Sequence, residues 1–365
     1  MKKTILHSAH LKHGAKMSPF GGFDMPLQYS GIIAEHTAAR SRAAVFDTCH
    51  MGEISIQGPN AVSDLEKIVS SPVSSMETGQ CRYGLMCNAE GGVIDDEILY
   101  RFSNDSFLMV VNSGTYESDY SWICRNVSPD TRVENKSEVT AKIDLQGPLS
   151  PKIMQQISEV SIRDLKYFRF LKSRWKGNDL LISRTGYTGE IGFEIYSENT
   201  CAEDLWDECL RLGAVPAGLG ARDTLRLEMG MPLYGHELSI ERNAAESGFV
   251  KTSADSKTFI GSVIVADESK SVYLLTGLQF PDRRAARHGD ICLCPETKAE
   301  IGVVTSGSFA PSLGYSIALA YVRKKYAVKN NQIEIKNERK NLIASVTSVP
   351  FYRAATGRKN INDYL

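Results

Sequence analysis

The chain has 365 residues, of which 42% are hydrophobic and 23% charged, and its 42 Lys and Arg residues nearly balance its 43 Asp and Glu residues. These values are ordinary for a globular protein of two or three domains, and a net charge of -1 excludes a global basic field that would hold nucleic acid or an anionic membrane. No stretch approaches the ~18 apolar residues of a membrane span, and the first residues contain no long apolar region. We therefore expect a soluble, cytoplasmic protein in which any anion site is local.

The first half of the chain mixes helical and strand patterns. Residues 30–46 contain alanines and spaced isoleucines and predict a helix, and residues 52–58 alternate like a strand. A clearer helix is expected over 58–71, where Asn60 can serve as the N-cap of an apolar stripe. The segments IDDEILYRF and SFLMVVN flank Asn104-Asp105, which predicts a β-hairpin.

The second half changes from mixed to almost wholly β. Residues 192–197 alternate like a strand, and residues 202–213 predict a helix that places Leu205 and Cys209 on one face and stops at Gly213. From about Val272 onward the pattern becomes a series of short strands with polar turns: LLTGLQF, IGVVTSGSF, IALAYV, QIEIK and IASVTSVPFY. The class is therefore α+β, with a separate all-β domain after about residue 272.

The cysteines and histidines indicate no metal site. The chain is too long to need a disulfide framework and has no CxxC pair, so we expect free, mostly buried thiols at Cys49, Cys81, Cys87, Cys124, Cys201, Cys209, Cys292 and Cys294. The spacing of His7, His10 and His13 is typical of a surface segment. We therefore predict no metal ligands.

The segment GGVIDDEILY, residues 91–100, is the first candidate site. Side chains alternate along a strand, so Asp96 shares one face with Ile98 and Tyr100, while Asp95 lies on the other face. A carboxylate beside an aromatic ring suits a flat, nitrogen-rich ligand, from which it can accept a hydrogen bond or a proton. The alternative is that both aspartates are turn residues at a strand entrance, and the residues alone leave both interpretations open.

The segment RTGYTGEIGFEIY, residues 184–196, is the second candidate site. Its three glycines permit sharp turns or close backbone approach, but a strand follows them and no G-x-x-x-x-G-K-[ST] pattern is present, which disfavours a phosphate-binding loop. Glu194 can accept two N–H donors from a ligand edge. The alternative, which periodicity favours, is that Glu194 lies on a solvated outer face.

The segment AGLGARDTLRLEMGMPLYGHEL, residues 217–238, is the third. It predicts a short helix in which Arg222 can bind a carboxylate with two parallel hydrogen bonds. The alternative is a salt bridge from Arg222 to Asp223 or Glu228 on a solvated face. We expect the lone His236 to be structural.

Together these segments resemble the T-protein family of folate-dependent aminomethyltransferases over nearly the whole chain. The resemblance includes nine strings in register, among them HGAKMSPFGGFDMPLQYSGIIAEHTAAR, VFDTCHMGE, YGLMCNAEGGVIDDEILY, RTGYTGEIGFEI, GLGARDTLRLEMGMPLYGHEL and IGVVTSGSFAPSLGYSIALAYV. It implies a three-domain cloverleaf around a central folate cavity. The expected units are residues 1–55 with about 140–165 and 235–270, about 56–139 with 166–234, and a barrel- or jelly-roll-like β domain over about 272–365.

The resemblance also implies the reaction. A lipoylated carrier, the H-protein, transiently presents an aminomethyl group, tetrahydrofolate takes its carbon as a methylene group, and ammonia and the dihydrolipoyl arm are released. Asp96 matches the key acidic residue beside the reactive folate nitrogens. Glu194 matches the residue that reads the pterin ring edge, and Arg222 an arginine that pairs with the glutamate tail of folate.

The same resemblance suggests further cavity residues. Met51, Tyr83 and Tyr100 match positions around the flat rings of the ligand. A second arginine near the C-terminus often completes the tail site, and both Arg353 and Arg358 are candidates.

Two departures from the family pattern keep alternatives open. Cys49 stands where the family usually has Ser, and residues 241–261 lack the usual Pro-x-Glu-Ala-Gly-Leu segment and the Trp that follows it. A tetrahydrofolate-dependent demethylase with another small donor is therefore one alternative. A non-catalytic folate-binding protein is the other, although the Lys-Gly-Cys motif of that branch is missing from this sequence.

Overall fold

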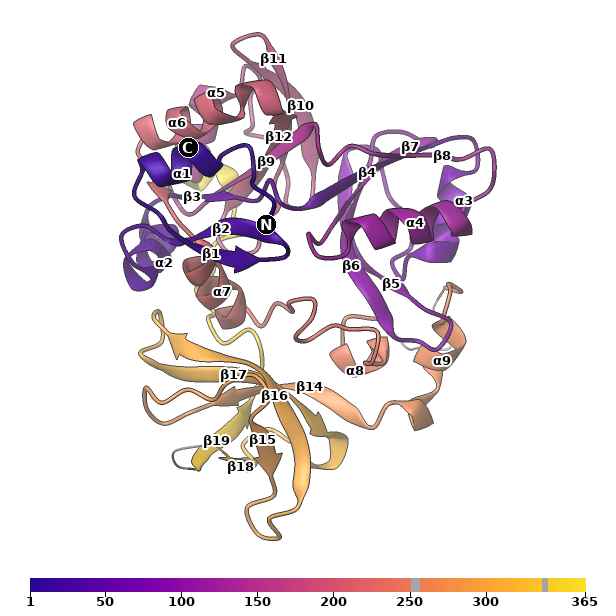
Figure 1. Ribbon diagram of the computed structural model, residues 1–365, viewed down its shortest axis with the longest axis vertical. Helices are drawn as coiled ribbons and strands as arrows, with labels where there is room; N and C mark the ends of the chain where they lie inside the picture. The colour runs from indigo at the N-terminus through magenta and orange to yellow at the C-terminus, as the bar shows by residue number, and fades with distance from the viewer. Residues whose placement is uncertain (251–256, 337–340) are drawn as a thin grey trace.

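The computed structural model describes residues 1–250, 257–336 and 341–365, which form three lobes (Figure 1). One lobe is built on a six-stranded sheet, the second on a five-stranded sheet, and the third is a closed six-stranded barrel. The expected α+β class with a C-terminal β-barrel is confirmed. No helix within the described ranges is long and apolar enough to cross a membrane.

The six-stranded sheet has the order β10-β11-β12-β9-β3-β13. Its strands are β3 (Ala44–Asp47), β9 (Thr140–Gln146), β10 (Phe170–Trp175), β11 (Asn178–Ser183), β12 (Gly192–Glu198) and β13 (Val215–Pro216). The helices of this lobe are α1 (His7–Lys12), α2 (Ile32–Ser41), α5 (Ser150–Ile157), α6 (Ala202–Arg211) and α7 (Leu219–Glu228). Apolar residues of α1, α5 and α6 pack together with those of the strands, and Trp206 is fully buried among them. A short hairpin, β1 (Lys16–Phe20) and β2 (Phe23–Gln28), completes the lobe.

The five-stranded sheet has the order β5-β6-β7-β4-β8. Its strands are β4 (Gly52–Gln57), β5 (Gln80–Cys87), β6 (Val93–Arg101), β7 (Ser106–Val111) and β8 (Arg132–Asn135), with helices α3 (Ala61–Ile68) and α4 (Tyr116–Asn126). The β6–β7 hairpin turns at Asn104-Asp105, as predicted. Asn60 occupies the N-cap position of α3 but donates its side-chain amide to Ser128 instead of capping the helix.

The strand pairing of the first two lobes differs from the division we expected. Residues 166–234, which we grouped with 56–139, supply β10, β11, β12 and β13 of the six-stranded sheet. They belong there because β12 pairs with β9 along its whole length. The predicted helix over 30–46 also ends early, at Ser41. The β-branched and aromatic residues that follow form β3 in the buried interior of the sheet.

The barrel begins at Tyr273, close to the predicted boundary. Its strands are β14 (Tyr273–Gln279), β15 (Ile291–Leu293), β16 (Glu300–Ala310), β17 (Tyr315–Arg323), β18 (Gln332–Lys336) and β19 (Leu342–Thr347). Short helices α8 (Ala244–Ser247) and α9 (Ser262–Ala266) precede it. Single 3₁₀ turns complete the structure at Asn199–Cys201, Glu268–Lys270, Lys324–Tyr326 and Ile361–Tyr364.

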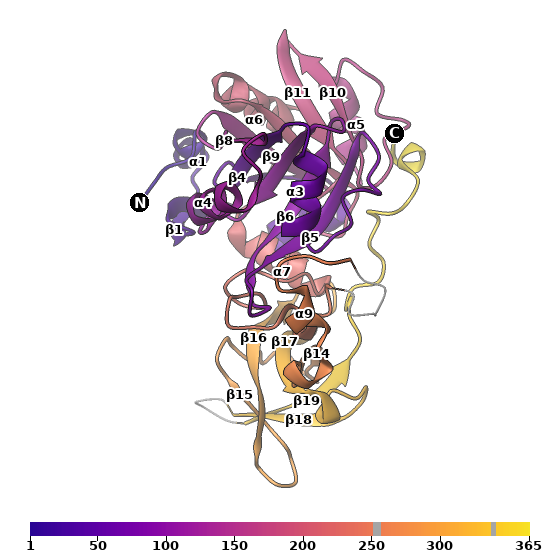
Figure 2. The same cartoon turned by 90° about the vertical axis from the view of Figure 1, so that its right-hand side faces the viewer.

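The segment after the barrel returns to the first lobe. Figure 2 shows it running from the barrel back along the molecule to a C-terminal end near α5. There the backbone N–H of Gly357 donates to Gly189 O (2.9 Å), and Ile191 N donates to Thr356 Oγ1 (2.9 Å). The returning segment, residues 348–365, therefore contacts the loop that precedes β12 through Thr356 and Gly357.

The free thiols follow the prediction. All eight cysteines are unpaired, six are buried, and only Cys124 is exposed.

A close backbone contact in the barrel predicts a large loss of stability. A Cβ at Gly302 would lie 2.1 Å from the carbonyl oxygen of Tyr321 on the neighbouring strand. Gly302→Ala is expected to lower the free energy of unfolding by about 1–3 kcal/mol, because the paired strands must move apart. Urea-induced unfolding measures the change. Gly114→Ala is the control, since open space surrounds that position, and equal stability of the two variants would contradict the prediction.

Candidate functional site

A cavity of about 430 Å³ lies between the two sheets. Its wall combines residues of both lobes with the connection that precedes the barrel and with the returning C-terminal segment. The lining side chains are mainly apolar or aromatic and include Phe20, Met51, Tyr83, Ile98, Val110, Tyr167, Tyr187, Tyr234 and Phe249. Few charged groups face it, which is typical of a site for a flat organic ligand.

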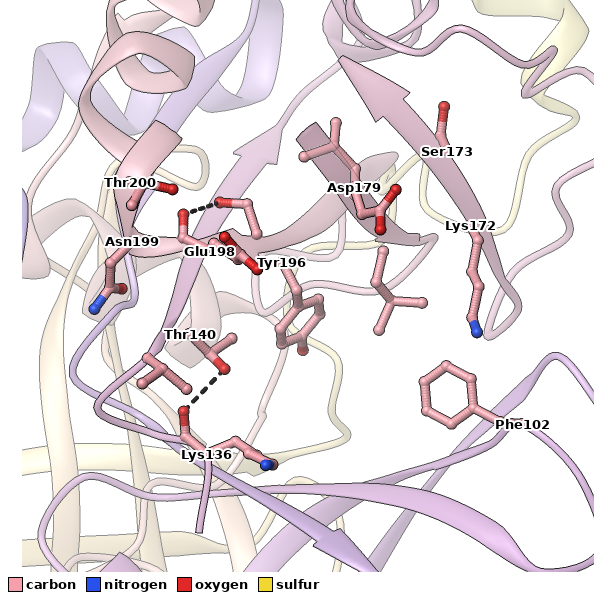
Figure 3. A pocket seen from close by; sticks show the side chains of 14 residues that line it. Phe102, Lys136, Thr140, Lys172, Ser173, Asp179, Tyr196, Glu198, Asn199 and Thr200 are labelled. Atoms are coloured by element: carbon pink, nitrogen blue, oxygen red, sulfur yellow. Dashed lines mark hydrogen bonds between the residues drawn. The ribbon is translucent and has the colours of Figure 1, made fainter. Parts of the chain in front are cut away.

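A larger pocket of about 750 Å³ is lined by residues of β10, β11 and β12 together with Phe102 and Lys136 (Figure 3). Its polar groups form local contacts rather than converging on one point. Thr140 Oγ1 donates to the carbonyl of Lys136 (2.9 Å), and the ammonium of Lys172 lies 5.1 Å from the ring centre of Phe102. This pocket therefore lacks the convergent polar groups of a binding site, and we place the candidate site in the smaller cavity.

Asp96 lies in the cavity wall on β6. Its Oδ2 accepts a hydrogen bond from the Tyr83 hydroxyl (3.0 Å), and its Oδ1 accepts one from Asn112 Nδ2 (2.7 Å). Strand alternation correctly places Asp96 and Ile98 at the cavity, and the turn-residue interpretation is wrong because both aspartates lie within the strand. Burial and the neighbouring Asp95 raise the pKa of Asp96 to about 7. Asp96 can therefore take or give a proton near neutral pH.

Asp95 is fully buried on the opposite face of β6. It accepts hydrogen bonds from Asn112 N (2.9 Å), Asn112 Nδ2 (2.7 Å) and Thr115 Oγ1 (2.8 Å). Burial and Asp95 raise the pKa of Asp119 on α4 to about 10, so Asp119 carries a proton. Asn112 thus connects the two aspartates, and the charge on Asp95 acts on Asp96.

Glu194 lies on β12 and is only 4% exposed. The interpretation that places Glu194 on a solvated outer face is therefore wrong. The Tyr100 hydroxyl (3.4 Å), Thr185 Oγ1 and Lys142 Nζ all donate to its carboxylate. Glu194 nevertheless lines the cavity. Its carboxylate is therefore held in one orientation beside the ligand space.

Arg222 lines the cavity from α7. Its Nη1 donates to Asp144 Oδ2 (2.7 Å), and its guanidinium carbon lies 4.8 Å from the ring centre of Tyr187. The alternative, a salt bridge from Arg222 to Asp223 or Glu228, is wrong, because Asp223 pairs with Arg226 and Glu228 pairs with Arg40.

The remaining predicted residues divide into those at the cavity and those away from it. Met51, Tyr83 and Arg358 line it, and Arg358 lies over the ring of Tyr167 at 5.5 Å. Arg353 instead donates to Ser348 Oγ (2.7 Å) in an exposed position.

The prediction that Tyr100 lines the cavity is wrong. Tyr100 is fully buried, with its ring centre 5.5 Å from that of Phe170 and 5.6 Å from that of Tyr196. It shares the face of Asp96 but lies two residues beyond Ile98, where the first sheet covers β6. It therefore supports Glu194 from behind the wall.

The glycines of residues 184–196 allow close packing around Gln146. A Cβ at Gly186 would lie 2.2 Å from Gln146 Oε1, and one at Gly192 would lie 2.5 Å from Gln146 Cδ. The close-approach interpretation of this motif is therefore confirmed.

The polar residues that hold the predicted site residues in place escaped sequence analysis: Asn112, Lys142 and Asp144. Asn112 directly follows the apolar strand SFLMVV. Its sequence position gives no sign of a role, which becomes visible only when the structure places it beside Asp96. Lys142 and Asp144 alternate with apolar residues in the buried strand AKIDLQ. Two charged residues on one face of a central strand could have indicated a buried ion-pair network, because buried charges need partners.

Comparisons with known proteins cover almost the whole chain. Residues 6–254 match the family described as the GCVT N-terminal domain, and residues 274–353 match the glycine cleavage T-protein C-terminal barrel domain. The aminomethyltransferase of Desulforamulus reducens is 40% identical over 360 residues, which cover 97% of this chain and 98% of that protein.

Other relatives agree. The aminomethyltransferase of Halothermothrix orenii is 40% identical over 358 residues, covering 96% of this chain and 100% of that protein. The crystal structure of the glycine cleavage system aminomethyltransferase T from Bartonella henselae superimposes with a TM-score of 0.90 at 30% identity, covering 96% of this chain and 98% of that one.

Proposed function

The chain belongs to the glycine cleavage T-protein family and is an aminomethyltransferase, and on that basis we propose that its cavity binds tetrahydrofolate as the acceptor of the one-carbon unit. The donor is the aminomethyl group on the lipoyl arm of the H-protein, which docks transiently. The observation that carries the proposal is the position of Asp96, held by Tyr83 and Asn112 in the wall of a mainly apolar cavity.

The reaction exchanges the two bonds of the transferred carbon. The aminomethyl carbon loses its bonds to nitrogen and sulfur and gains bonds to two folate nitrogens. The two protons that the folate nitrogens lose leave with ammonia and with the new thiol. Asp96 takes a proton from the attacking folate nitrogen and returns it to a leaving group, a role that suits a carboxyl whose pKa is about 7.

The wall of the cavity supports this ligand. Tyr83, Tyr187 and Phe249 supply flat apolar surface for the rings, and Glu194 supplies acceptors for ring N–H groups. Arg222 and Arg358 bring two guanidinium groups to the cavity that can donate hydrogen bonds to the ligand.

The two departures from the family pattern lie differently with respect to the cavity. Cys49 is half-buried and donates its thiol to the carbonyl of Lys142 (3.3 Å), outside the cavity lining. The departing segment 241–261 contributes Phe249, whose ring centre lies 6.0 Å from that of Tyr83. Residues 251–256 of this segment lie outside the described residues.

A single-turnover assay tests the proposal. Tetrahydrofolate is mixed with aminomethyl-loaded lipoyl carrier, and methylene-tetrahydrofolate and ammonia are followed together. We expect both products in equal amounts. Tetrahydrofolate binding without either product would overturn the proposed donor and favour a demethylase or a folate-binding protein without turnover.

The raised pKa of Asp96 predicts a pH dependence. Below about pH 7 Asp96 is protonated and cannot act as a base, so kcat/KM should rise with pH and reach half its maximum near pH 7. Asp95→Asn removes the neighbouring charge that raises this pKa, so the half-maximum should move to lower pH. Stopped-flow rates between about pH 5.5 and pH 9 measure both curves. Superimposable curves would contradict the prediction.

The two C-terminal arginines provide a matched pair of variants. Arg358→Ala is expected to raise the KM for tetrahydrofolate by about tenfold or more, because a cation at the cavity loses its bond to the glutamate tail. Arg353→Ala should leave KM within about twofold, since Arg353 lies away from the cavity. Steady-state kinetics with tetrahydrofolate as the varied substrate distinguish the two, and equal effects would remove Arg358 from the tail site.

A further inference from the structure

Four charged side chains form a continuous row behind one wall of the cavity. Glu194 Oε1 accepts from Lys142 Nζ at 2.5 Å, Lys142 Nζ lies 3.5 Å from Asp144 Oδ1, and Asp144 Oδ2 accepts from Arg222 Nη1 at 2.7 Å. The signs alternate along the row, and its net charge is zero.

The two ends of the row face the cavity, and its middle is buried. Glu194 and Arg222 line the cavity, whereas the side chains of Lys142 and Asp144 are 1% and 0% exposed. Burial opposes the charge on Lys142, but Asp144 and Glu194 outweigh it and raise its pKa. Burial likewise opposes the charge on Asp144, but Lys142 and Arg222 lower its pKa. Lys142 and Asp144 therefore keep their opposite charges at neutral pH.

A row of this kind fixes its end members. Lys142 also contacts Met51 Sδ (3.4 Å), and its ammonium lies 5.8 Å from the ring centre of Tyr196, so it has little freedom to move. A carboxylate that entered beside Arg222 would compete with Asp144 and would add an uncompensated charge to a buried region. A neutral ring with adjacent N–H and carbonyl groups would bond to Glu194 and Arg222 without changing the charge.

We propose that Lys142 and Asp144 are positioning residues that join Glu194 and Arg222 into one neutral row, which adapts this end of the cavity to an uncharged hydrogen-bonding ring rather than to a carboxylate. The inference rests on the proposed function, in which the ring is the pterin of tetrahydrofolate. Arg222 then donates to the ring carbonyl, and the glutamate tail is left to Arg358. Within the described residues no carboxylate pairs with Arg358, which leaves its charge available.

The test uses three variants of the full chain and two small probes. Lys142→Met and Asp144→Asn each remove one charge from the row, and the double variant removes both and restores a net charge of zero. The probes are a tetrahydropterin without the benzoyl-glutamate tail and benzoate, a simple aromatic carboxylate. Lys136→Met is the control, because Lys136 pairs with Glu134 on the exposed surface.

Each single variant is expected to raise the Kd for the tetrahydropterin by about tenfold, because Lys142→Met leaves Glu194, and Asp144→Asn leaves Arg222, without its charged partner. The double variant should recover to within about threefold of the original protein. Asp144→Asn should lower the Kd for benzoate by about tenfold, because this substitution leaves the guanidinium of Arg222 free to bind a carboxylate. Lys142→Met should not lower the Kd for benzoate. With tetrahydrofolate, KM should change much more than kcat, since Asp96 belongs to another part of the wall.

In Asp144→Asn the expected changes in Kd have opposite signs for the two probes, whereas a general loss of folding would weaken the binding of both. Unchanged tetrahydropterin affinity in either single variant, or losses that simply add in the double variant, would overturn the inference. Probe binding as expected, with no turnover in the loaded-carrier assay, would instead overturn the proposed function and leave the inference standing.

Discussion

Replacing Asp96 with Asn is expected to lower kcat by about 10²- to 10⁴-fold, the range that a positioned proton acceptor typically contributes. The amide of Asn keeps the shape of the side chain and can retain the contacts with Tyr83 and Asn112. It cannot take a proton from the attacking folate nitrogen at neutral pH. The Kd for tetrahydrofolate should therefore stay within a few-fold of its original value.

Single-turnover rates at saturating tetrahydrofolate, together with a binding titration, measure the two quantities separately. Asp105→Asn in the exposed β6–β7 turn is the matched control and should leave both unchanged. An Asp96→Asn protein with undiminished kcat would remove Asp96 from the mechanism. A protein that no longer binds tetrahydrofolate would reassign Asp96 to binding.

Replacing Glu194 with Gln should raise the KM for tetrahydrofolate by up to about 100-fold, with a smaller effect on kcat. Hydrogen bonds to a charged group contribute about 1.5–3 kcal/mol, and the substitution removes this charge while it leaves Lys142 buried without one of its two partners.

Glu198→Gln is the control for this substitution, since Glu198 lies at the exposed end of the same strand. Steady-state kinetics and thermal unfolding of both variants should be compared. A Glu194→Gln protein with an unchanged KM would exclude Glu194 from ligand recognition. An equal loss of stability and affinity would assign it a structural role only.

The position of Asp96 was predictable because alternation along a strand is a local rule. The pattern GGVIDDEILY predicts the strand. Because side chains alternate between its two faces, Asp96 shares the face of Ile98 and Tyr100 while Asp95 lies on the other face. The same rule places Tyr100 on the face of Asp96, and the family resemblance suggested that Tyr100 lines the cavity. Alternation gives the face of a strand but not the point at which a neighbouring sheet covers that face. Whether Tyr100 is covered depends on how β10 and β12 pack against β6, and the local sequence around β6 contains no information on this packing between distant strands.

The row of charges behind the cavity was not predictable for a related reason. The sequence allowed Arg222 to pair with Asp223 or Glu228, its neighbours on the helix, but its partner Asp144 is 78 residues away. The division into lobes was also misjudged, because residues 166–234 follow the second sheet in sequence and yet pair with β9 of the first. Local periodicity identifies elements, whereas pairing between distant strands decides the domain boundaries.

Because Arg358 lies in the returning segment 348–365, the cavity is completed late in the synthesis of the chain. The two sheets that hold Asp96 and Glu194, and the helix α7 that holds Arg222, are complete when residue 228 has been made, but Arg358 is added only after all six barrel strands. A ligand that needs Arg358 cannot bind tightly to the nascent chain. Before Arg358 has been made, only their own packing can stabilise the first two lobes, and the binding free energy of such a ligand can add to their stability only afterwards.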